Sequence, residues 1–300
     1  MKAAEFSLAV PTDGRAALAR GWLWLGLVAL LASGVFALLL VLARTPGFQH
    51  VVPWEGFFHT ALVVHVDLSV LVWFIAFGGV MWSLGAGTRW LGLAWVGAGV
   101  AAFGTGMIVL APFVDVGNPL INNYVPVLQQ PFFLIALALF GIGALLLVVR
   151  TLVAAFPARH RDGGAATLHF GIVAAALTAA IAALALAWSY ATLPESIAGR
   201  AYYELLFWGG GHVLQFTYTL LMLVAWLWLA SAADVSVALP ARVVLFLLVL
   251  GFVPVLLVPI AYLAFPVSAA EHVLFFTLHM QYAGGIAAAP LALVLLYGLA

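Results

Sequence analysis

The stretch from Tyr203 to Ser231, YELLFWGGGHVLQFTYTLLMLVAWLWLAS, decides how the chain folds. Its single charged residue, Glu204, lies at the start, and the rest is almost wholly apolar. A helix of about 20 mainly apolar residues is long enough to cross the hydrocarbon core of a bilayer. The stretch therefore predicts a membrane-spanning helix, and it raises the question of why such a helix carries His212 directly after three glycines.

Further apolar runs of similar length recur along the chain, separated by segments with proline, glycine and charge. The predicted spans are Gly21–Ala43, Gly56–Leu84, Trp90–Ala111, Pro131–Phe156, Thr167–Tyr190, Tyr203–Ser231, Val243–Phe265 and Ala270–Leu299. Each run is continuous rather than alternating, which favours helices over a β-barrel. The sequence thus predicts an all-α fold, a polytopic bundle of about eight transmembrane helices that forms a single domain over residues 1–300.

The composition indicates an integral membrane protein in contact with the lipid bilayer. Hydrophobic residues make up 67% of the chain and charged residues 7%, whereas soluble domains carry about 25% charged residues. The chain has no cysteine, which excludes disulfides, zinc–thiolate sites, iron–sulfur clusters and covalently attached c-type haem. Histidine is then the main ligand for a transition metal, and the net charge of zero gives no indication of nucleic-acid binding.

The basic residues set the expected orientation. If the N-terminus is cytoplasmic, the inner segments hold Lys2, Arg15, Arg20, Arg89, Arg150, Arg159, Arg161 and Arg242, and the outer segments hold Arg44 and Arg200. This excess of inner positive charge predicts a cytoplasmic N-terminus, in keeping with a bacterial inner membrane. The last run then ends inside apolar sequence at Ala300, which suggests a chain truncated at its C-terminus.

Three histidines are expected at one depth in the membrane. Each of His65, His212 and His279 lies nine residues in from the outer end of its predicted helix, or roughly 10–15 Å below the outer surface at about 1.5 Å per residue. His272 precedes His279 by seven residues and so shares its helix face. The remaining histidines are expected in loops (His50, His160), near the outer surface (His59) and near the inner side (His169).

These polar and small residues have two interpretations each. A membrane histidine can simply hydrogen-bond a neighbouring helix, but three at one depth favour a bound metal or haem iron, because neutral imidazole is a good iron and copper ligand. The glycines at 209–211 either let a neighbouring helix approach closely or clear room for a macrocycle or a diatomic substrate. Asp67 is either a proton-path carboxylate or a neutral acid bonded to a neighbour.

Two stretches resemble the haem–copper oxidase superfamily, the catalytic subunit I of respiratory cytochrome c oxidases and nitric oxide reductases. HVDLSVLVWFIAF, which begins at His65, looks like the second-helix segment whose histidine binds the low-spin haem. ELLFWGGGHVLQF looks like the sixth-helix W-x-x-G-H segment whose histidine binds the active-site copper. The resemblance implies that His65 is an axial ligand of a low-spin haem b, that His212 is a copper ligand, and that a second haem lies beside the copper.

The chain departs from the family's pattern in its later helices. VPIAYLAF, with Tyr262 and no histidine, stands where the family's seventh helix carries adjacent histidines, and Phe216 stands where some members carry a redox tyrosine. The tenth-helix H-x-H, which supplies the remaining haem ligands, has no counterpart. Either the chain is a truncated, divergent member, or His279, His272, Glu271 or Tyr262 replaces the lost ligands. His279 is the first substitute, and Tyr262 is the candidate catalytic residue.

Three functions remain open. The first is an oxidoreductase subunit that passes electrons from a cytochrome c or quinol through haem b to a metal centre reducing O2 or NO, alongside other oxidase subunits. The second is a b-type cytochrome without oxygen chemistry, which needs only two facing histidines such as His65 and His279. The third is a transporter whose histidines bind a metal ion or relay protons, with Pro254, Pro259 and Pro290 supplying broken helices.

Overall fold

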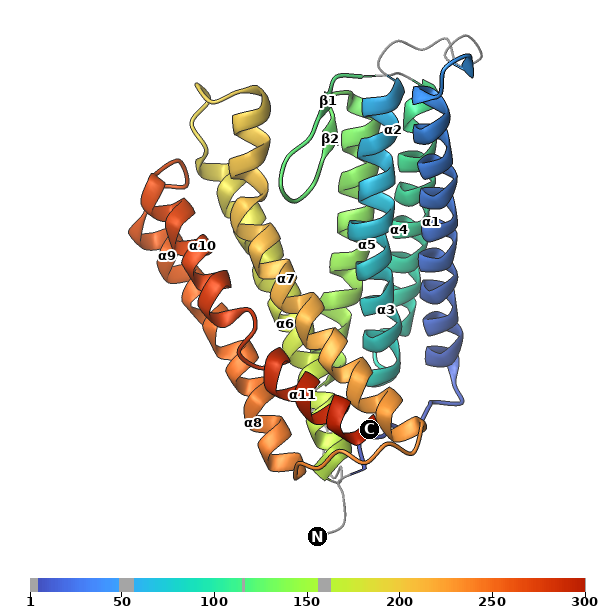
Figure 1. The fold of residues 1–300 in the computed structure, drawn as a ribbon, viewed down its shortest axis with the longest axis vertical. Helices are drawn as coiled ribbons and strands as arrows, with labels where there is room; N and C mark the ends of the chain where they lie inside the picture. The colour runs from blue at the N-terminus through green and yellow to red at the C-terminus, as the bar shows by residue number, and fades with distance from the viewer. Residues whose placement is uncertain (1–4, 49–56, 115–116, 156–162, 300) are drawn as a thin grey trace.

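The computed structural model describes residues 5–48, 57–114, 117–155 and 163–299, and these are almost wholly helical. Within them, eight segments are long and apolar enough to cross a membrane, which confirms the predicted all-α bundle (Figure 1). The helical elements are α1 (Gly14–Arg44), α2 (Phe57–Val66), η2 (Asp67–Val72), α3 (Trp73–Gly85), α4 (Leu91–Val114), α5 (Pro131–Ala155), α6 (Gly163–Thr192), α7 (Gly199–Ala232), α8 (Ala241–Phe252), η3 (Val253–Leu257), α9 (Val258–Ala264), α10 (Ala270–Ala283) and α11 (Ala288–Leu299).

The first span begins earlier than the predicted Gly21, because Asp13 caps the helix at Gly14. A carboxylate oxygen of Asp13 accepts a hydrogen bond from the backbone N–H of Arg15 at 2.9 Å. The same carboxylate pairs with the Arg15 guanidinium at 2.8 Å. Hydrogen bonds from the side chain and backbone of Arg15 hold the pKa of Asp13 at about 2. The cap therefore stays ionised at neutral pH, and the helix extends into sequence that hydropathy alone assigns to the polar N-terminal segment.

Two predicted spans are not single helices. The seventh passes through the 3-10 segment η3 between α8 and α9, because Pro259 lacks the N–H that a continuous α-helix would need. The eighth ends at Ala283 and restarts at Ala288, two residues before Pro290. As a result α11 turns away from the line of α10 and lies against α7 and α8 (Figure 1).

The second span is continuous but changes its helical form. Residues Asp67–Val72 form a π-helical turn, η2, between α2 and α3. Such turns are rare and occur mostly as single insertions inside α-helices. The turn begins two residues after His65. The candidate haem ligand therefore lies on α2, and the π turn changes the rotation of the following α3 about the helix axis relative to α2.

The helices pack as two groups joined along one side (Figure 1). In one group α4 packs along α5, and α1 along α2 and α3. In the other, α6 packs along α7, with α8 to α11 outside them. The groups meet where α5 and α3 contact α6 and where α3 contacts α7. A large apolar core runs through both groups, and a smaller one between α6, α7, α9 and α10 contains Phe216, Tyr262 and Phe276.

A short β-hairpin departs from the all-helical expectation. Strands β1 (Pro119–Leu120) and β2 (Val127–Leu128) pair antiparallel between α4 and α5, with Pro119 opposite Leu128. The hairpin does not extend outward from the bundle but folds down beside α7 (Figure 1). Val127 and Leu128 are fully buried. The loop between the third and fourth spans is therefore part of the interior.

Three arginines expected on the cytoplasmic side meet at one end of the bundle. The buried Arg150 of α5 donates from Nε to the carbonyl of Arg89 at 3.1 Å and from Nη2 to the carbonyl of Gly87. Arg15 donates to the carbonyl of Ala86 at 2.7 Å. These bonds fix the turn between α3 and α4 and place the predicted inner segments together.

The contact between α4 and α5 depends on glycines that let the two backbones touch. A Cβ added at Gly104 would lie 2.5 Å from the backbone nitrogen of Phe140, and one added at Gly97 would lie 2.7 Å from the carbonyl of Gly143. Small residues of this kind are the usual means of close helix contact in membranes.

Gly143→Ala should push α4 and α5 apart, because its Cβ would overlap the backbone of Ala101 and lie 2.5 Å from the carbonyl of Gly97. We expect a loss of about 1–3 kcal/mol and a lower midpoint of thermal unfolding, followed by intrinsic tryptophan fluorescence of the purified protein. Gly141→Ala is the matched control, since no atom of the described part of the chain lies within 4 Å of its Cβ position. Equal effects of the two substitutions would contradict this packing.

Candidate functional site

The predicted ligand histidines fall into two places rather than one. His65 belongs to α2, which packs against α1. His212 lies on α7, and His272 and His279 lie on α10, which packs against α7 and α9. In Figure 1, α2 and α10 lie on opposite sides of α7. The predicted common layer is therefore divided laterally into a His65 position and a group on α7 and α10.

His65 is oriented by Ser33 of α1. Its Nδ1 lies 2.9 Å from the Ser33 carbonyl oxygen. The Ser33 hydroxyl lies 2.9 Å from the same nitrogen and donates to the His65 carbonyl at 3.0 Å. Because that hydroxyl proton is used, the imidazole proton is assigned to Nδ1, which donates to the Ser33 carbonyl. The lone pair of His65 is then on Nε2.

His212 is held within its own helix and by Tyr124 of the hairpin. Nδ1 lies 2.8 Å from the Trp208 carbonyl, to which it donates. The Tyr124 hydroxyl lies 2.8 Å from Nδ1 and 2.9 Å from Nε2. Because Nδ1 carries the proton, the lone pair is on Nε2, and the Tyr124 hydroxyl lies almost equally far from both nitrogens instead of on the axis of that lone pair.

His279 also donates from one ring nitrogen to a backbone carbonyl, but the donor is Nε2 and not Nδ1. Nε2 lies 2.9 Å from the Pro254 carbonyl and donates to it. In the 3-10 segment the Val258 N–H bonds to Val255, so the Pro254 carbonyl is left without its usual α-helical donor. The Nδ1 atom of His279 is buried and has no hydrogen-bond partner within the described ranges.

Phe276 lies at the centre of the α7–α10 group. Its ring centroid is 5.6 Å from that of His212, 5.1 Å from that of His272 and 6.5 Å from that of His279. His272 is fully buried, and neither of its ring nitrogens makes a hydrogen bond with the residues that the structure describes. His272 and His279 therefore share a helix face, and a phenylalanine ring separates them from His212.

A metal ion and a haem iron make different demands on the described residues. Within the described ranges, no three histidine, aspartate or glutamate side chains lie close enough to hold one metal ion. A copper centre with three protein ligands is thus not assembled by this part of the chain. A haem iron can be held by a single histidine, and His65, with a fixed ring and a lone pair on Nε2, fits that requirement. Glu271, the other possible substitute ligand, is exposed on α10.

The three glycines before His212 each face a different neighbour. A Cβ at Gly209 would overlap the Tyr262 hydroxyl and lie 3.1 Å from Phe276. One at Gly210 would lie 3.1 Å from the Ala182 carbonyl of α6, and one at Gly211 would overlap the Tyr124 ring. The glycines thus allow the close approach of one helix and of two tyrosine side chains.

Tyr262, the candidate catalytic residue, is buried on α9 at the edge of this group. Its hydroxyl lies 2.9 Å from the Ser189 hydroxyl of α6. Its ring meets that of His272 edge-on, with centroids 4.8 Å apart. Phe216, one turn after His212, packs its ring 4.8 Å from that of His279. The phenol is therefore beside the histidine group and bonded to serine.

Tyr124 was not anticipated from the sequence. It lies in a loop between predicted spans, and hydropathy carries no signal for a loop that folds inward. Burial, with the nearby Glu204 carboxylate as a smaller cause, raises the pKa of Tyr124 above its ordinary value. The phenol therefore stays protonated beside the His212 ring.

Asp67 lies in the π-helical turn with both carboxylate oxygens buried. Neither oxygen has a hydrogen-bond partner among the described residues, so the bonded neighbour expected for a neutral, structural acid is not found there. Among the other histidines, His59 is exposed at the start of α2, and His169 lies on α6. His50 and His160 lie outside the described residues.

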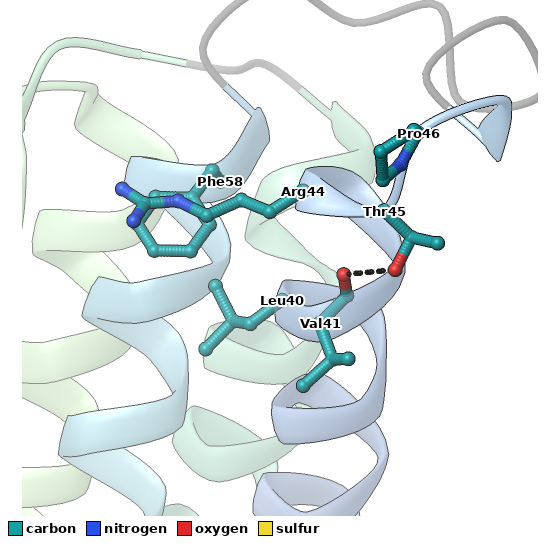
Figure 2. A pocket seen from close by; sticks show the side chains of 6 residues that line it. All are labelled: Leu40, Val41, Arg44, Thr45, Pro46 and Phe58. Carbon is teal, nitrogen blue, oxygen red and sulfur yellow. Dashed lines mark hydrogen bonds between the residues drawn. The ribbon is translucent and has the colours of Figure 1, made fainter.

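A shallow apolar hollow at the end of α1 is separate from these groups (Figure 2). Arg44 places its guanidinium over the ring of Phe58, 3.7 Å from the centroid. Thr45 closes the last turn by donating to the Val41 carbonyl at 2.9 Å. None of the candidate ligand residues lines this hollow.

Comparison with known proteins finds bacterial relatives. An uncharacterized protein of Rickettsia prowazekii (strain Madrid E) is 28% identical over 299 aligned residues, which cover 90% of this chain and 58% of the relative. An uncharacterized protein of Aquifex aeolicus (strain VF5) is 31% identical over 206 residues, which cover 69% of this chain and 52% of the relative. The chain thus spans little more than half the length of these relatives. No protein-family model and no solved structure matches it.

The bond between Ser189 and Tyr262 should be detectable as an energetic coupling. We expect Ser189→Ala and Tyr262→Phe each to cost about 1 kcal/mol, and the double variant to cost no more than the larger single loss, because both remove the same bond. Unfolding in denaturant measures the cycle. The control cycle combines Tyr262→Phe with a substitution of Thr178 in place of the substitution of Ser189. Thr178 also lies on α6, but its hydroxyl donates to the Ala174 carbonyl of its own helix. That cycle should be additive, and additive losses in the first would contradict the coupling.

Proposed function

We propose that this chain is a haem-binding subunit of the haem–copper oxidase type, which carries electrons through a b-type haem held by His65. The resemblance of the His65 and His212 segments suggested this assignment. The supporting observation is a shared pattern in the three candidate histidines. Each donates one ring N–H to a backbone carbonyl, of Ser33, Trp208 or Pro254, and keeps a lone pair on the other nitrogen.

This pattern is typical of metal-binding histidines. A second hydrogen bond from the ring fixes the tautomer and the ring plane, and it raises the basicity of the ligating nitrogen. Every neutral imidazole keeps a lone pair on the nitrogen that carries no proton, so what these hydrogen bonds add is a fixed tautomer and a fixed ring plane. His65 meets the requirement most simply, because its N–H is bound to α1 and its Nε2 lies on the opposite side of the ring.

A bound haem b would supply a one-electron carrier, and the protein would supply its position and its dry surroundings. Ser33 and α1 would hold the His65 ring. Electrons would come from a cytochrome c or a quinol at the outer side, in a bacterial inner membrane, and other oxidase subunits would complete the assembly. These partners follow from the proposed relationship to the oxidases.

Reduction of O2 or NO would need a second metal centre near His212, with His279 and His272 as substitute ligands. We assign no step to such a centre, because the described residues do not bring three ligands together. The same observation favours a second candidate function, a b-type cytochrome that transfers electrons without oxygen chemistry. In both cases the role of His65 is the same.

The purified chain should give a reduced-minus-oxidised optical spectrum of the b type, with haem measured per polypeptide. His65→Ala should abolish the signal, because it removes the axial nitrogen. His59→Ala is the matched control, since His59 lies on the same helix but is exposed, and it should keep the full haem content. Haem retained in His65→Ala would contradict the ligand assignment.

His279→Ala separates the remaining alternatives. Because His279 lies with His212 rather than beside His65, we expect this variant to keep its haem. Loss of haem in His279→Ala would identify His279 as the second axial ligand. A wild-type chain without haem would contradict the proposal and favour a transporter of metal ions or protons, for which the breaks between α8 and α9 and between α10 and α11 would be suitable.

A further inference from the structure

Four arginines lie at the end of the bundle where α1 and α4 begin. Arg150 is buried, and its guanidinium donates to two backbone carbonyls of the turn between α3 and α4. Arg15 donates to a third carbonyl of that turn. Arg20 on α1 and Arg89 in the turn are exposed. These four residues, Arg15, Arg20, Arg89 and Arg150, form the basic group of this end.

The positive charge of the basic group is only partly balanced. Arg15 pairs with Asp13 at 2.8 Å, and the other three arginines have no carboxylate partner among the described residues. Nη1 of Arg150 is buried and has no hydrogen-bond partner there. A buried cation is costly unless an anion lies close to it. The excess of guanidinium groups over carboxylates therefore favours an anionic ligand at this end.

The start of α4 adds backbone donors in the same place. The first N–H groups of an α-helix have no acceptor within the helix, and they favour anions. In the described part of the chain, nothing accepts a hydrogen bond from the N–H of Leu91 or Gly92, and Gly92 is exposed. At α1 the corresponding position is capped by Asp13. The uncapped start of α4 thus follows Arg89 in the turn that Arg150 holds from inside.

Exposed tryptophans adjoin the basic group. Trp24 lies one turn after Arg20 on α1 and is 66% exposed, and Trp95 lies one turn into α4 and is 44% exposed. A Cβ added at Gly21 of α1 would lie 3.5 Å from the Trp95 ring, so the two helices meet at this depth. Tryptophan is enriched at the boundary between headgroups and hydrocarbon. The surface therefore offers positive charge and, beside it, aromatic contact for acyl chains.

We infer that the basic group and the start of α4 bind the phosphate of an anionic phospholipid. The net negative charge of such a lipid balances the arginines, and its acyl chains pass over Trp24 and Trp95. Basic pockets between transmembrane helices on the cytoplasmic side bind lipid headgroups of this kind. A lipid is favoured over free phosphate because the exposed tryptophans continue the site into the hydrocarbon. The inference does not depend on the haem proposed at His65.

The first experiment measures quenching of tryptophan fluorescence by lipids with brominated acyl chains. The full chain is reconstituted in phosphatidylcholine bilayers that contain a fixed fraction of brominated phosphatidylglycerol or of brominated phosphatidylcholine. We expect the brominated phosphatidylglycerol to quench more strongly, because it gathers at the basic group beside Trp24 and Trp95. Equal quenching by the two lipids would overturn the inference.

Arginine variants test whether the preference belongs to this place. We expect Arg20→Gln and Arg89→Gln each to lower the preference for phosphatidylglycerol about five-fold, the effect of one basic residue near an anionic membrane surface. Both side chains are exposed, and Arg150 uses only the backbone carbonyl of Arg89, so the fold should be kept. Arg242→Gln is the matched control, because Arg242 is exposed at the start of α8, on the other side of the bundle from α1 (Figure 1). An equal loss in Arg242→Gln would indicate general attraction to the membrane and would overturn the site.

Tryptophan variants test where the acyl chains lie. The double variant Trp24→Phe and Trp95→Phe should lose the excess quenching by brominated phosphatidylglycerol, because it removes the fluorophores beside the site. Trp226→Phe is the control, since Trp226 is 36% exposed on α7, and it should keep the excess. Excess quenching that survives in the double variant would place the lipid elsewhere. Excess quenching of the wild type that inorganic phosphate abolishes would identify free phosphate as the occupant, and either result would overturn the inference.

Discussion

Polar atoms inside this bundle cost free energy unless they find partners within the protein, because hydrocarbon offers no hydrogen bonds. The helices satisfy most backbone groups, so a buried imidazole must use a carbonyl that can accept a second bond or that a helix irregularity has released. His65 uses a carbonyl on the neighbouring α1, His212 one a turn back in its own helix, and His279 one in the 3-10 segment. Backbone geometry therefore decides which nitrogen of each ring presents a lone pair.

The glycines at 209–211 answer the question of why an apolar helix carries an imidazole at that point. Each glycine leaves one side of α7 open to something specific: the Tyr262 phenol, the backbone of α6 and the Tyr124 ring. His212 follows them, and the Tyr124 hydroxyl that Gly211 admits lies beside its ring. Gly210 serves the close approach of a helix, one of the two alternatives in the sequence, whereas Gly209 and Gly211 admit tyrosine side chains and not a macrocycle or a diatomic substrate.

The spans could be predicted from the sequence because a bilayer demands a minimum length of apolar chain. The lateral positions of the helices could not, since depth along a helix says nothing about which helix stands beside it. His65 and His279 therefore share a predicted depth, but their helices, α2 and α10, lie on opposite sides of α7 (Figure 1). Tyr124 was missed because its place depends on a turn at Asn122 and a gap at Gly211, which come from different segments. Pro259 predicted a break in the seventh span. It did not predict that the break would leave the Pro254 carbonyl free to accept a hydrogen bond from His279.

The π-helical turn after His65 has a consequence for the history of this chain. A π turn holds one residue more than the α-helix around it, and one residue corresponds to about 100° of rotation. The extra residue sets the phase of α3, whose Phe74 stacks on Tyr218 of α7 with centroids 4.9 Å apart. A homologue with a one-residue deletion between positions 67 and 72 would therefore turn a different set of side chains toward α7. Such a gap would mark a rearranged interface and not a neutral change in length.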